Sequence, residues 1–256
     1  MSCRINITQE WCTRLECELN YHKESCFLTL TYDDEHLPVD LSLRPEHMRD
    51  FMKRLRYYIP TRIKYYGVGE YGETTMRPHY HLIIFGWQPD ISDLELHGKV
   101  RSSKFLCNVW KHGFNSVGTV THDSIQYTVG YIRKKLYGQK AQDVYGFRIH
   151  PFSRSSQGLG LSYAQDHKQR IVEDKKVTIK GVNRGLPKYF ADKLELDKDE
   201  LKLRSVEKNE KLCRETPNLT PKERWLVWRE STRQMEKNHE ALHNLRSAGR
   251  GGRSDI

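Results

Sequence analysis

The sequence has no long apolar run. No stretch approaches the roughly 18 consecutive apolar residues that a membrane-spanning helix needs, and no signal peptide opens the chain. Hydrophobic residues make up 37% of the 256 residues, and the mean hydropathy is −0.78. These absences argue against a membrane protein and against an exported one, so we expect a protein of the cytoplasm.

The sequence also lacks a Cys-x-x-Cys pair. It contains six cysteines, of which four lie in the first 26 residues: Cys3, Cys12, Cys17, Cys26, Cys107 and Cys213. The spacings within the first four do not match a standard zinc finger. We therefore expect reduced, partly buried thiols, with a zinc site among the first four cysteines as the alternative.

Positive charge is in excess. The formal net charge is +10, and the sequence pI is about 9.2. Such a balance favours a polyanionic partner, with nucleic acid as the first expectation and an anionic membrane as the alternative. Lysines and arginines are mixed with acidic residues along the chain, so the charge alone does not locate a binding surface, and a merely soluble basic protein stays open.

Hydrophobic periodicity and turn signals predict an α+β fold with a central antiparallel β-sheet flanked by helices. Two strands, 63–70 and 79–85, are close enough in the sequence to form a hairpin. The predicted helices cover residues 8–22 (capped by Thr8), 45–59, 92–111 and 125–137 (capped by Asp123 and Ser124, closed by Gly138). Further strands are predicted at 26–32 and 115–121, with a short hairpin around 170–179.

A His-x-His pair opens the strand at residues 79–85. Strand side chains alternate between faces, so His79 and His81 project from the same face, and the hairpin brings Glu70 opposite them. Two imidazoles and one carboxylate make a suitable ligand set for a divalent ion with open positions. Glu73 competes with Glu70 for the third position. Two strand histidines without a ligand are the plain alternative.

The predicted helix at 125–137 carries Tyr127, Tyr131 and Lys134 on one face, because residues three and four apart are neighbours on a helix. A tyrosine phenolate is a competent nucleophile at phosphorus, although its pKa near 10 means that it needs help. A metal ion can polarise a scissile phosphate, and a lysine can stabilise the charge that develops. The alternative is an ordinary amphipathic helix with packed tyrosines and a solvated lysine.

These motifs resemble a known family. His79-Tyr80-His81 followed by Tyr127-x3-Tyr131-x2-Lys134 is similar to the HUH endonucleases that initiate rolling-circle replication. Closer resemblance is to the replication initiators of microviruses of the gokushovirus group, including those of chlamydiae. It covers residues 3–195 and rests on segments that occur in the family's order: Phe27–Pro38, Gly69–Glu73, Arg77–Gly86 and Tyr127–Lys135.

The resemblance implies an HUH endonuclease fold with the histidines on a middle strand. It also implies a nickase that cuts one strand of the replicative-form origin, forms a 5′-phosphotyrosine and later rejoins the strand. The implied cofactor is Mg2+ or Mn2+. The implied partners are single-stranded and double-stranded phage DNA, a host helicase and a host DNA polymerase, in the host bacterial cytoplasm and without a membrane. Matched by motif, His79 and His81 are metal ligands, Tyr127 and Tyr131 are nucleophiles, and Lys134 is the assisting lysine.

Two further expectations concern organisation and rival functions. We expect a nuclease domain over residues 1–195 and a charged, mostly helical extension over 196–256. The extension should contain a helix at 221–245, opened by a capping box at Thr220, and end in a flexible basic tail. The rival functions are a transposase or relaxase of the same chemistry, and a catalytically silent, prophage-derived DNA-binding protein.

Overall fold

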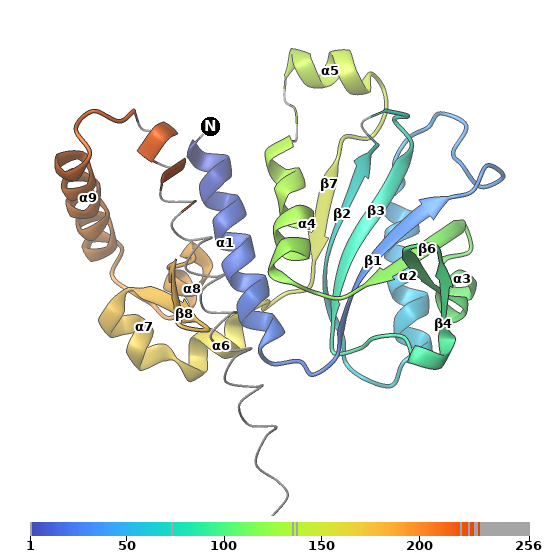
Figure 1. The fold of residues 1–256 in the computed structure, drawn as a ribbon, viewed down its shortest axis with the longest axis horizontal. Helices are drawn as coiled ribbons and strands as arrows, with labels where there is room; N and C mark the ends of the chain where they lie inside the picture. The colour runs from blue at the N-terminus through green and yellow to red at the C-terminus, as the bar shows by residue number, and fades with distance from the viewer. Residues whose placement is uncertain are drawn as a thin grey trace, which may run out of the picture. The chain divides into compact units, whose positions relative to one another are not determined.

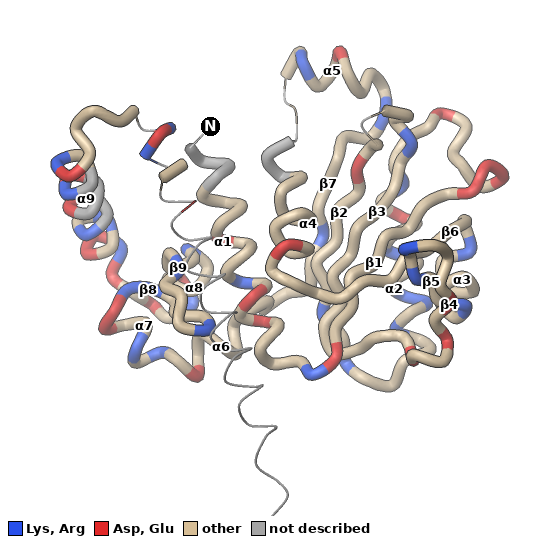
Figure 2. Tube along the Cα trace, in the orientation of Figure 1, with Lys and Arg blue, Asp and Glu red and all other residues tan. Residues whose placement is uncertain are grey.

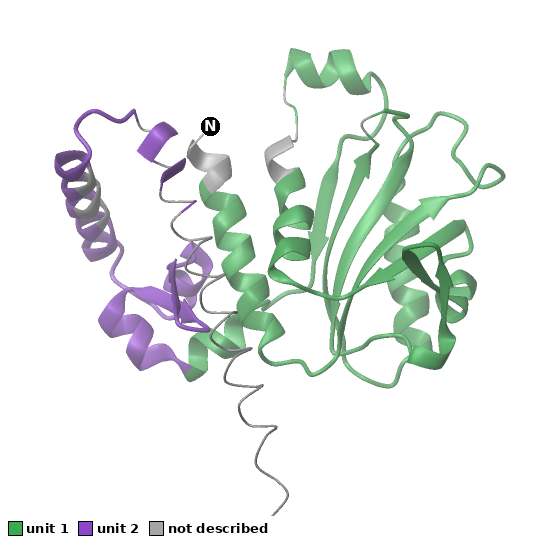
Figure 3. Cartoon of the chain, in the orientation of Figure 1, with its two compact units in different colours: residues 1–166 green, residues 167–256 purple. Residues whose placement is uncertain are grey.

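The structure is a computed structural model that describes residues 2–72, 74–134, 136, 138–220, 222–224, 226–227 and 230. It divides into two compact units, residues 1–166 and residues 167–256 (Figures 1 and 3). The domain boundary expected near residue 195 stays a prediction. In the described residues, no helix is both long enough and apolar enough to cross a membrane.

The first unit is built on an antiparallel sheet. In the described residues, seven strands lie in the order β4-β5-β6-β1-β3-β2-β7, and each neighbouring pair is antiparallel. The strands are β1 (Ser25–Tyr32), β2 (Lys64–Tyr71), β3 (Pro78–Phe85), β4 (Leu94–His97), β5 (Val100–Ser103), β6 (Gly113–Gly118) and β7 (Phe152–Ser155). The helices are α1 (Ser2–Leu19), α2 (Pro45–Tyr58), the 3-10 turn Ile91–Asp93, α3 (Lys104–Trp110), α4 (His122–Lys134), α5 (Gln139–Tyr145) and α6 (Leu161–Asp166). The predicted α+β class with a central antiparallel sheet is confirmed.

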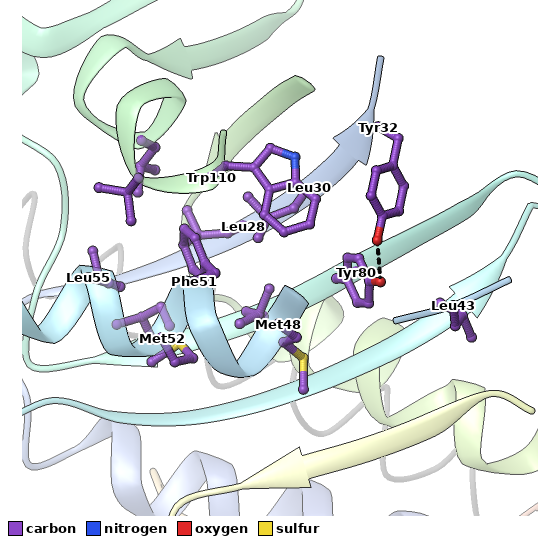
Figure 4. Packing of buried hydrophobic residues seen from close by; sticks show 14 of the residues in the cluster. Leu28, Leu30, Tyr32, Leu43, Met48, Phe51, Met52, Leu55, Tyr80 and Trp110 are labelled. Atoms are coloured by element: carbon purple, nitrogen blue, oxygen red, sulfur yellow. Dashed lines mark hydrogen bonds between the residues drawn. The ribbon is translucent and has the colours of Figure 1, made fainter. Parts of the chain in front are cut away.

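One face of the sheet packs against α2 and α3. Every second side chain of β1 is buried on this face, as the strand period of two requires. Trp110 of α3 is fully buried, and its indole N–H donates to the carbonyl oxygen of Thr31 at 3.1 Å. Tyr32 and Tyr80 share a hydroxyl–hydroxyl hydrogen bond of 2.7 Å inside the same core (Figure 4). This apolar layer fixes β1 and β3 as central strands.

The opposite face is covered by α1 and α4, which lie side by side (Figure 1). The buried apolar residues of this layer include Leu15 of α1, Ile83 and Phe85 of β3, and Ile125 and Val129 of α4. The two helices cover only the end of the sheet where these side chains lie. The polar side chains farther along β3 therefore stand at the edge of the covered area.

A buried carboxylate joins α1 to the sheet. Glu18 accepts hydrogen bonds from Lys64 of β2 at 3.0 Å, from the amide of Gly160 at 2.7 Å and from His22 at 2.7 Å. Burial opposes ionisation of this carboxyl, but the three hydrogen bonds and the charge of Lys64 outweigh burial and lower the pKa of Glu18. The charged group is thus fully partnered and holds α1 in place over β2.

Glycine is the one residue type that fits the start of β6. The backbone of Gly113 has φ +133, and a Cβ there would lie 2.2 Å from the amide nitrogen of Asp33 and 2.7 Å from the carbonyl oxygen of Thr31. Only glycine allows so close an approach of β6 to β1. The pairing that follows sets the position of every later residue of β6.

Several sequence predictions are confirmed. The strand at 26–32, the helix that begins at Pro45, and the hairpin of 63–70 with 79–85 correspond to β1, α2 and β2–β3. These segments have strong local signals: β-branched or aromatic strand residues, and proline at each end of the helix.

The helix predicted over 92–111 is wrong in its first part. Residues 94–103 form the β4–β5 hairpin, and only α3 is helical. Gly98 turns the chain with φ +62, a conformation that glycine adopts without strain. Helix α3 then begins after Ser103, whose hydroxyl accepts a hydrogen bond from the amide of Leu106 at 3.0 Å.

Other predicted boundaries are also corrected. Helix α1 begins at Ser2, so Thr8 is inside it and caps nothing. Helix α4 begins at His122, because the hydroxyl of Thr121 accepts from the amide of Ser124 at 3.1 Å and caps the helix. Gly138 occupies the N-cap position of α5. Strand β7 went unpredicted: it is four residues long and depends on pairing with β2.

The second unit is small and rich in charge. Its elements are α7 (Lys168–Asp174), β8 (Lys176–Ile179), β9 (Val182–Gly185), α8 (Lys188–Lys193) and α9 (Lys198–Glu215). The hairpin predicted around 170–179 is therefore the β8–β9 pair at 176–185. Charges of both signs follow one another along α9 (Figure 2). Thr220 and Glu223 form the predicted capping box. Most of the predicted 221–245 helix and the basic tail lie outside the described residues.

Candidate active site

The candidate site lies on the β2–β3 hairpin, on the face that α1 and α4 partly cover. The strand register pairs Glu70 with His79 and Val68 with His81. Directly opposed residues of an antiparallel pair share a face, so the carboxylate and both imidazoles meet there. The expected cross-strand position of Glu70 is confirmed. Glu73, its competitor in the sequence, lies outside the described residues.

The three side chains converge on a single point. Oε1 of Glu70 lies 2.8 Å from Nε2 of His79 and 3.0 Å from Nε2 of His81. One ligand-type atom from each residue falls within 4.8 Å of the others, and among the described residues this group alone has such a geometry. Glu70 and His81 are buried, with exposed fractions of 5% and 4%, whereas His79 is half-buried. Two nitrogen donors and one oxygen donor could therefore hold a divalent ion.

No described cysteine takes part in such a group. Cys12, Cys17 and Cys26 are buried free thiols, and Cys107 and Cys213 are exposed free thiols. The side chain of Cys3 is outside the described residues. The described cysteines thus agree with the expectation of reduced thiols.

The outer nitrogens of both imidazoles are held by hydrogen bonds. Nδ1 of His79 donates to the carbonyl oxygen of Arg77 at 3.1 Å, and Nδ1 of His81 is 2.9 Å from the hydroxyl oxygen of Thr29. A carbonyl oxygen only accepts, so this contact fixes the proton of His79 on Nδ1. In both rings Nε2 is then the nitrogen that is turned towards Glu70 and is available to a metal.

The charge states also suit metal binding. Burial opposes ionisation of Glu70, but hydrogen bonds from His79 and His81 outweigh burial and lower the pKa of the carboxyl. Burial lowers the pKa of His81, against the opposing effect of its bond to Glu70. An ionised carboxylate beside a neutral imidazole is the protonation state that a divalent ion requires of its ligands.

Two tyrosines of α4 pack against His81. The ring of Tyr131 is nearly parallel to His81, at 5.5 Å between centroids and 8° between planes. The ring of Tyr127 meets His81 edge-on at 5.2 Å and meets Tyr131 at 5.1 Å. Tyr127 is 51% exposed. Lys134 is the last residue of α4, but its side chain lies outside the described residues.

Two residues of β1 complete the surroundings of His81 and were not singled out from the sequence. Thr29 stands directly opposite His81 and bonds it, and Phe27 stacks on it at 5.7 Å with 12° between planes. Phe27 also meets the edge of Tyr127 at 6.3 Å. The available signal was the pair of threonines alternating with leucines in β1, since polar residues at every second position mark a face that is not core.

Thr29→Val should weaken metal binding by about 10-fold to 100-fold, because the group that orients the outer nitrogen of His81 is lost while side-chain size is kept. Isothermal titration with Mn2+ measures the effect. Thr31→Val, at the next position on the same face of β1, is the matched control and should bind Mn2+ as the unaltered chain does. Equal affinities for both variants would contradict an orienting role for Thr29.

Fold and site together define an α+β protein whose antiparallel sheet carries a carboxylate and two histidines able to hold a metal, beside two tyrosines. A family model described as a replication-associated protein of the ORF2 type matches residues 25–136, which span β1 to the end of α4. Every candidate site residue lies in that span. No solved structure gives a significant match.

Curated relatives extend the match beyond that span. The chain is 35% identical over 236 residues to replication-associated protein ORF2 of Spiroplasma virus 4, covering 84% of this chain and 73% of the relative. It is 34% identical to replication-associated protein ORF4 of Chlamydia phage 1, covering 75% of this chain and 51% of the relative. It is 32% identical to replication-associated protein VP4 of Bdellovibrio phage phiMH2K, covering 74% and 64%. The chain belongs to this family of viral replication-associated proteins, which confirms the resemblance inferred from the sequence.

Proposed function

We propose that this chain is a metal-dependent DNA nickase and strand-transferase that initiates rolling-circle replication of a phage genome. One observation carries the proposal: two tyrosine rings pack against His81, a member of the only described group able to hold a metal. The family membership supports a role in replication, and the excess of positive charge suits a nucleic-acid substrate.

The proposed metal ligands are Glu70, His79 and His81. A bound ion would act as a Lewis acid on the scissile phosphate and would orient it. With three protein ligands the ion keeps open positions for phosphate oxygens. We favour Mg2+ or Mn2+, because phosphate is an oxygen-rich ligand and both ions accept carboxylate and water together with it.

Tyr127 is the proposed nucleophile of the first cut. Its ring is held edge-on against His81 and Phe27, and about half of the side chain is open to an incoming strand. Its oxygen forms a bond to phosphorus while the bond from phosphorus to the 3′ oxygen breaks. The phenol loses its proton, and the departing 3′ oxygen gains one. The products are a 5′-phosphotyrosine and a free 3′-OH, which primes a polymerase.

Tyr131 is the proposed second nucleophile, and Lys134 the residue that stabilises developing charge. Because Tyr127 and Tyr131 are neighbours on α4, one can hold a 5′ end while the other attacks a second phosphate. The phosphotyrosine bond retains the energy of the broken phosphodiester, so rejoining by attack of a 3′-OH needs no further energy source.

The proposed substrates are single-stranded and double-stranded phage DNA at the origin. A host helicase and a host DNA polymerase are the proposed partners, and the host bacterial cytoplasm is the proposed place of action. In this proposal residues 1–195 form the nuclease domain and residues 196–256 a charged extension. Its mixed-sign helix α9 is available for contacts with DNA or with a host protein.

Incubation of the full chain with labelled single-stranded DNA from a phage origin and Mn2+ tests the proposal. A covalent protein–DNA adduct that survives denaturation is expected, together with a labelled fragment that ends in a 3′-OH. Chelation of the metal should abolish both. Salt-sensitive DNA binding without any adduct would contradict the proposal and favour a catalytically silent DNA-binding protein. Cleavage confined to a transposon end or a plasmid transfer origin would favour a transposase or relaxase.

A further inference from the structure

The row of side chains that contains the metal ligands continues across two more strands. Glu70 of β2 is paired with His79 of β3, His79 with Thr31 of β1, and Thr31 with Phe114 of β6. Directly opposed residues share a face of an antiparallel sheet. Phe114 therefore stands on the same face as the candidate active site, in line with the carboxylate and the first histidine.

A second contact places this part of β6 on the active-site face. A Cβ on Gly118 would lie 3.5 Å from the ring of Phe27, which itself stacks on His81. Gly118 and Phe114 are four residues apart on one strand and so point to the same side. Asn115 points the other way, is buried, and bonds the backbone of Ser103 near α3.

Phe114 is exposed although it lies within a paired strand. Its exposed fraction is 66%, whereas its neighbour Asn115 is 6% exposed. The apolar residues under α1 and α4 lie at the other end of the strands, so neither helix covers this row. A large ring left open to water on a rigid strand forgoes the free energy of its own burial, which favours a role in contacting a ligand.

The distance from the metal group suits a nucleotide that flanks the reacting phosphate. Phe114 lies two strands away from His79, which is about 10 Å at the usual strand spacing. Between them stands the hydroxyl of Thr31, a hydrogen-bonding group open to the same face. Aromatic rings on strands are effective stacking platforms for single-stranded nucleic acid, because every base offers a flat face.

We propose that Phe114 is a base-stacking residue, which holds a base of the single-stranded DNA substrate beside the scissile phosphate and so positions that phosphate over the metal group. This inference rests on the proposed function. The ligand is single-stranded DNA rather than a peptide or a second copy of the chain, because the exposed ring is continuous with a site whose proposed chemistry acts on a phosphodiester.

The test measures binding of a fluorescent single-stranded thymidine oligonucleotide to the full chain in EDTA, where no cleavage occurs. Phe114→Ala should weaken binding roughly 5-fold to 100-fold, the range for loss of one stacked base. Phe114→Trp should restore it. The dependence of affinity on salt should stay unchanged, because phenylalanine carries no charge and contacts no phosphate.

Tyr57→Ala is the matched control. Tyr57 is 84% exposed and lies on α2, which packs on the opposite face of the sheet, so its loss should leave DNA affinity unchanged. In a second measurement, an oligonucleotide with 5-iodouridine is irradiated on the protein, and the crosslinked peptide should contain Phe114. Affinities of Phe114→Ala equal to that of the unaltered chain would overturn the proposal, as would a change of oligomeric state in this variant, which would make a second copy the occupant.

The outcome separates this inference from the proposed function. DNA binding that depends on Phe114 without any covalent adduct would support the stacking role and contradict the nickase. Normal adduct formation with unaltered DNA affinity in Phe114→Ala would support the nickase and overturn the stacking role.

Discussion

The double variant Tyr127→Phe, Tyr131→Phe should form no covalent adduct with origin DNA in the presence of Mn2+. The substitution removes two hydroxyl groups and keeps both rings, so the contacts of these rings with His81 remain. Folding and metal binding should therefore be unchanged, while the attacking oxygen is absent. A denaturing gel of the labelled DNA measures the loss, which should be complete.

The single variants separate the two tyrosines. Tyr127→Phe should lose the first cut, because the half-exposed ring is the one open to an incoming strand. Tyr131→Phe should still form the adduct but fail to transfer the strand. Tyr57→Phe, on the other side of the sheet, is the control and should behave as the unaltered chain. Persistence of the adduct in the double variant would place the nucleophile elsewhere.

Glu70→Gln should abolish Mn2+ binding and reduce cleavage by at least about 1,000-fold. The variant keeps the size of the side chain but removes the charge that opposes the ion. A Lewis acid contributes several kcal/mol to such reactions, and each 1.36 kcal/mol corresponds to a factor of ten in rate. Titration calorimetry with Mn2+ and single-turnover cleavage measure the two effects. Glu10→Gln, on α1, is a control for a carboxylate removed outside the metal group.

The same variant has a second, independent readout in the metal-free protein. The pKa of Glu70 is lowered in the fold by its imidazole partners, so the ionised carboxylate stabilises the native state. That contribution is present above the unfolded pKa, near 4.5, and is lost as the pH falls through the lowered folded value. Glu70→Gln should lack this part of the acid destabilisation in thermal unfolding. Full Mn2+ binding by the variant would contradict the assignment of Glu70 as a ligand.

The metal group is the part of the site that local sequence predicts best. A strand period of two puts His79 and His81 on one face, and a short loop puts Glu70 opposite them, so the whole group follows from about a dozen consecutive residues. The helical period likewise predicts that Tyr127 and Tyr131 are neighbours. Errors occur where local signals mislead, as in the β4–β5 hairpin, whose Gly98 turn was read as part of a helix.

Contacts between distant segments depend on the tertiary structure. Thr29 and His81 are 52 residues apart in the sequence, and their bond exists because β1 pairs with β3 in a particular register. The position of Phe114 beside the site depends in the same way on β6 pairing with β1. A shift of one residue in either register would turn these side chains to the other face, and no local pattern specifies which register forms.

The sequence by itself determined the reacting groups: a carboxylate and two histidines on a hairpin, two tyrosines on a helix, and membership of a replication family. The tertiary structure alone decided that these two halves meet. Ile125 and Val129 of α4 pack against Ile83 and Phe85 of β3, and burial of that apolar surface sets the tyrosines against His81. Hydrophobic burial is non-directional, so the sequence pattern shows which faces are apolar but not which of them pair.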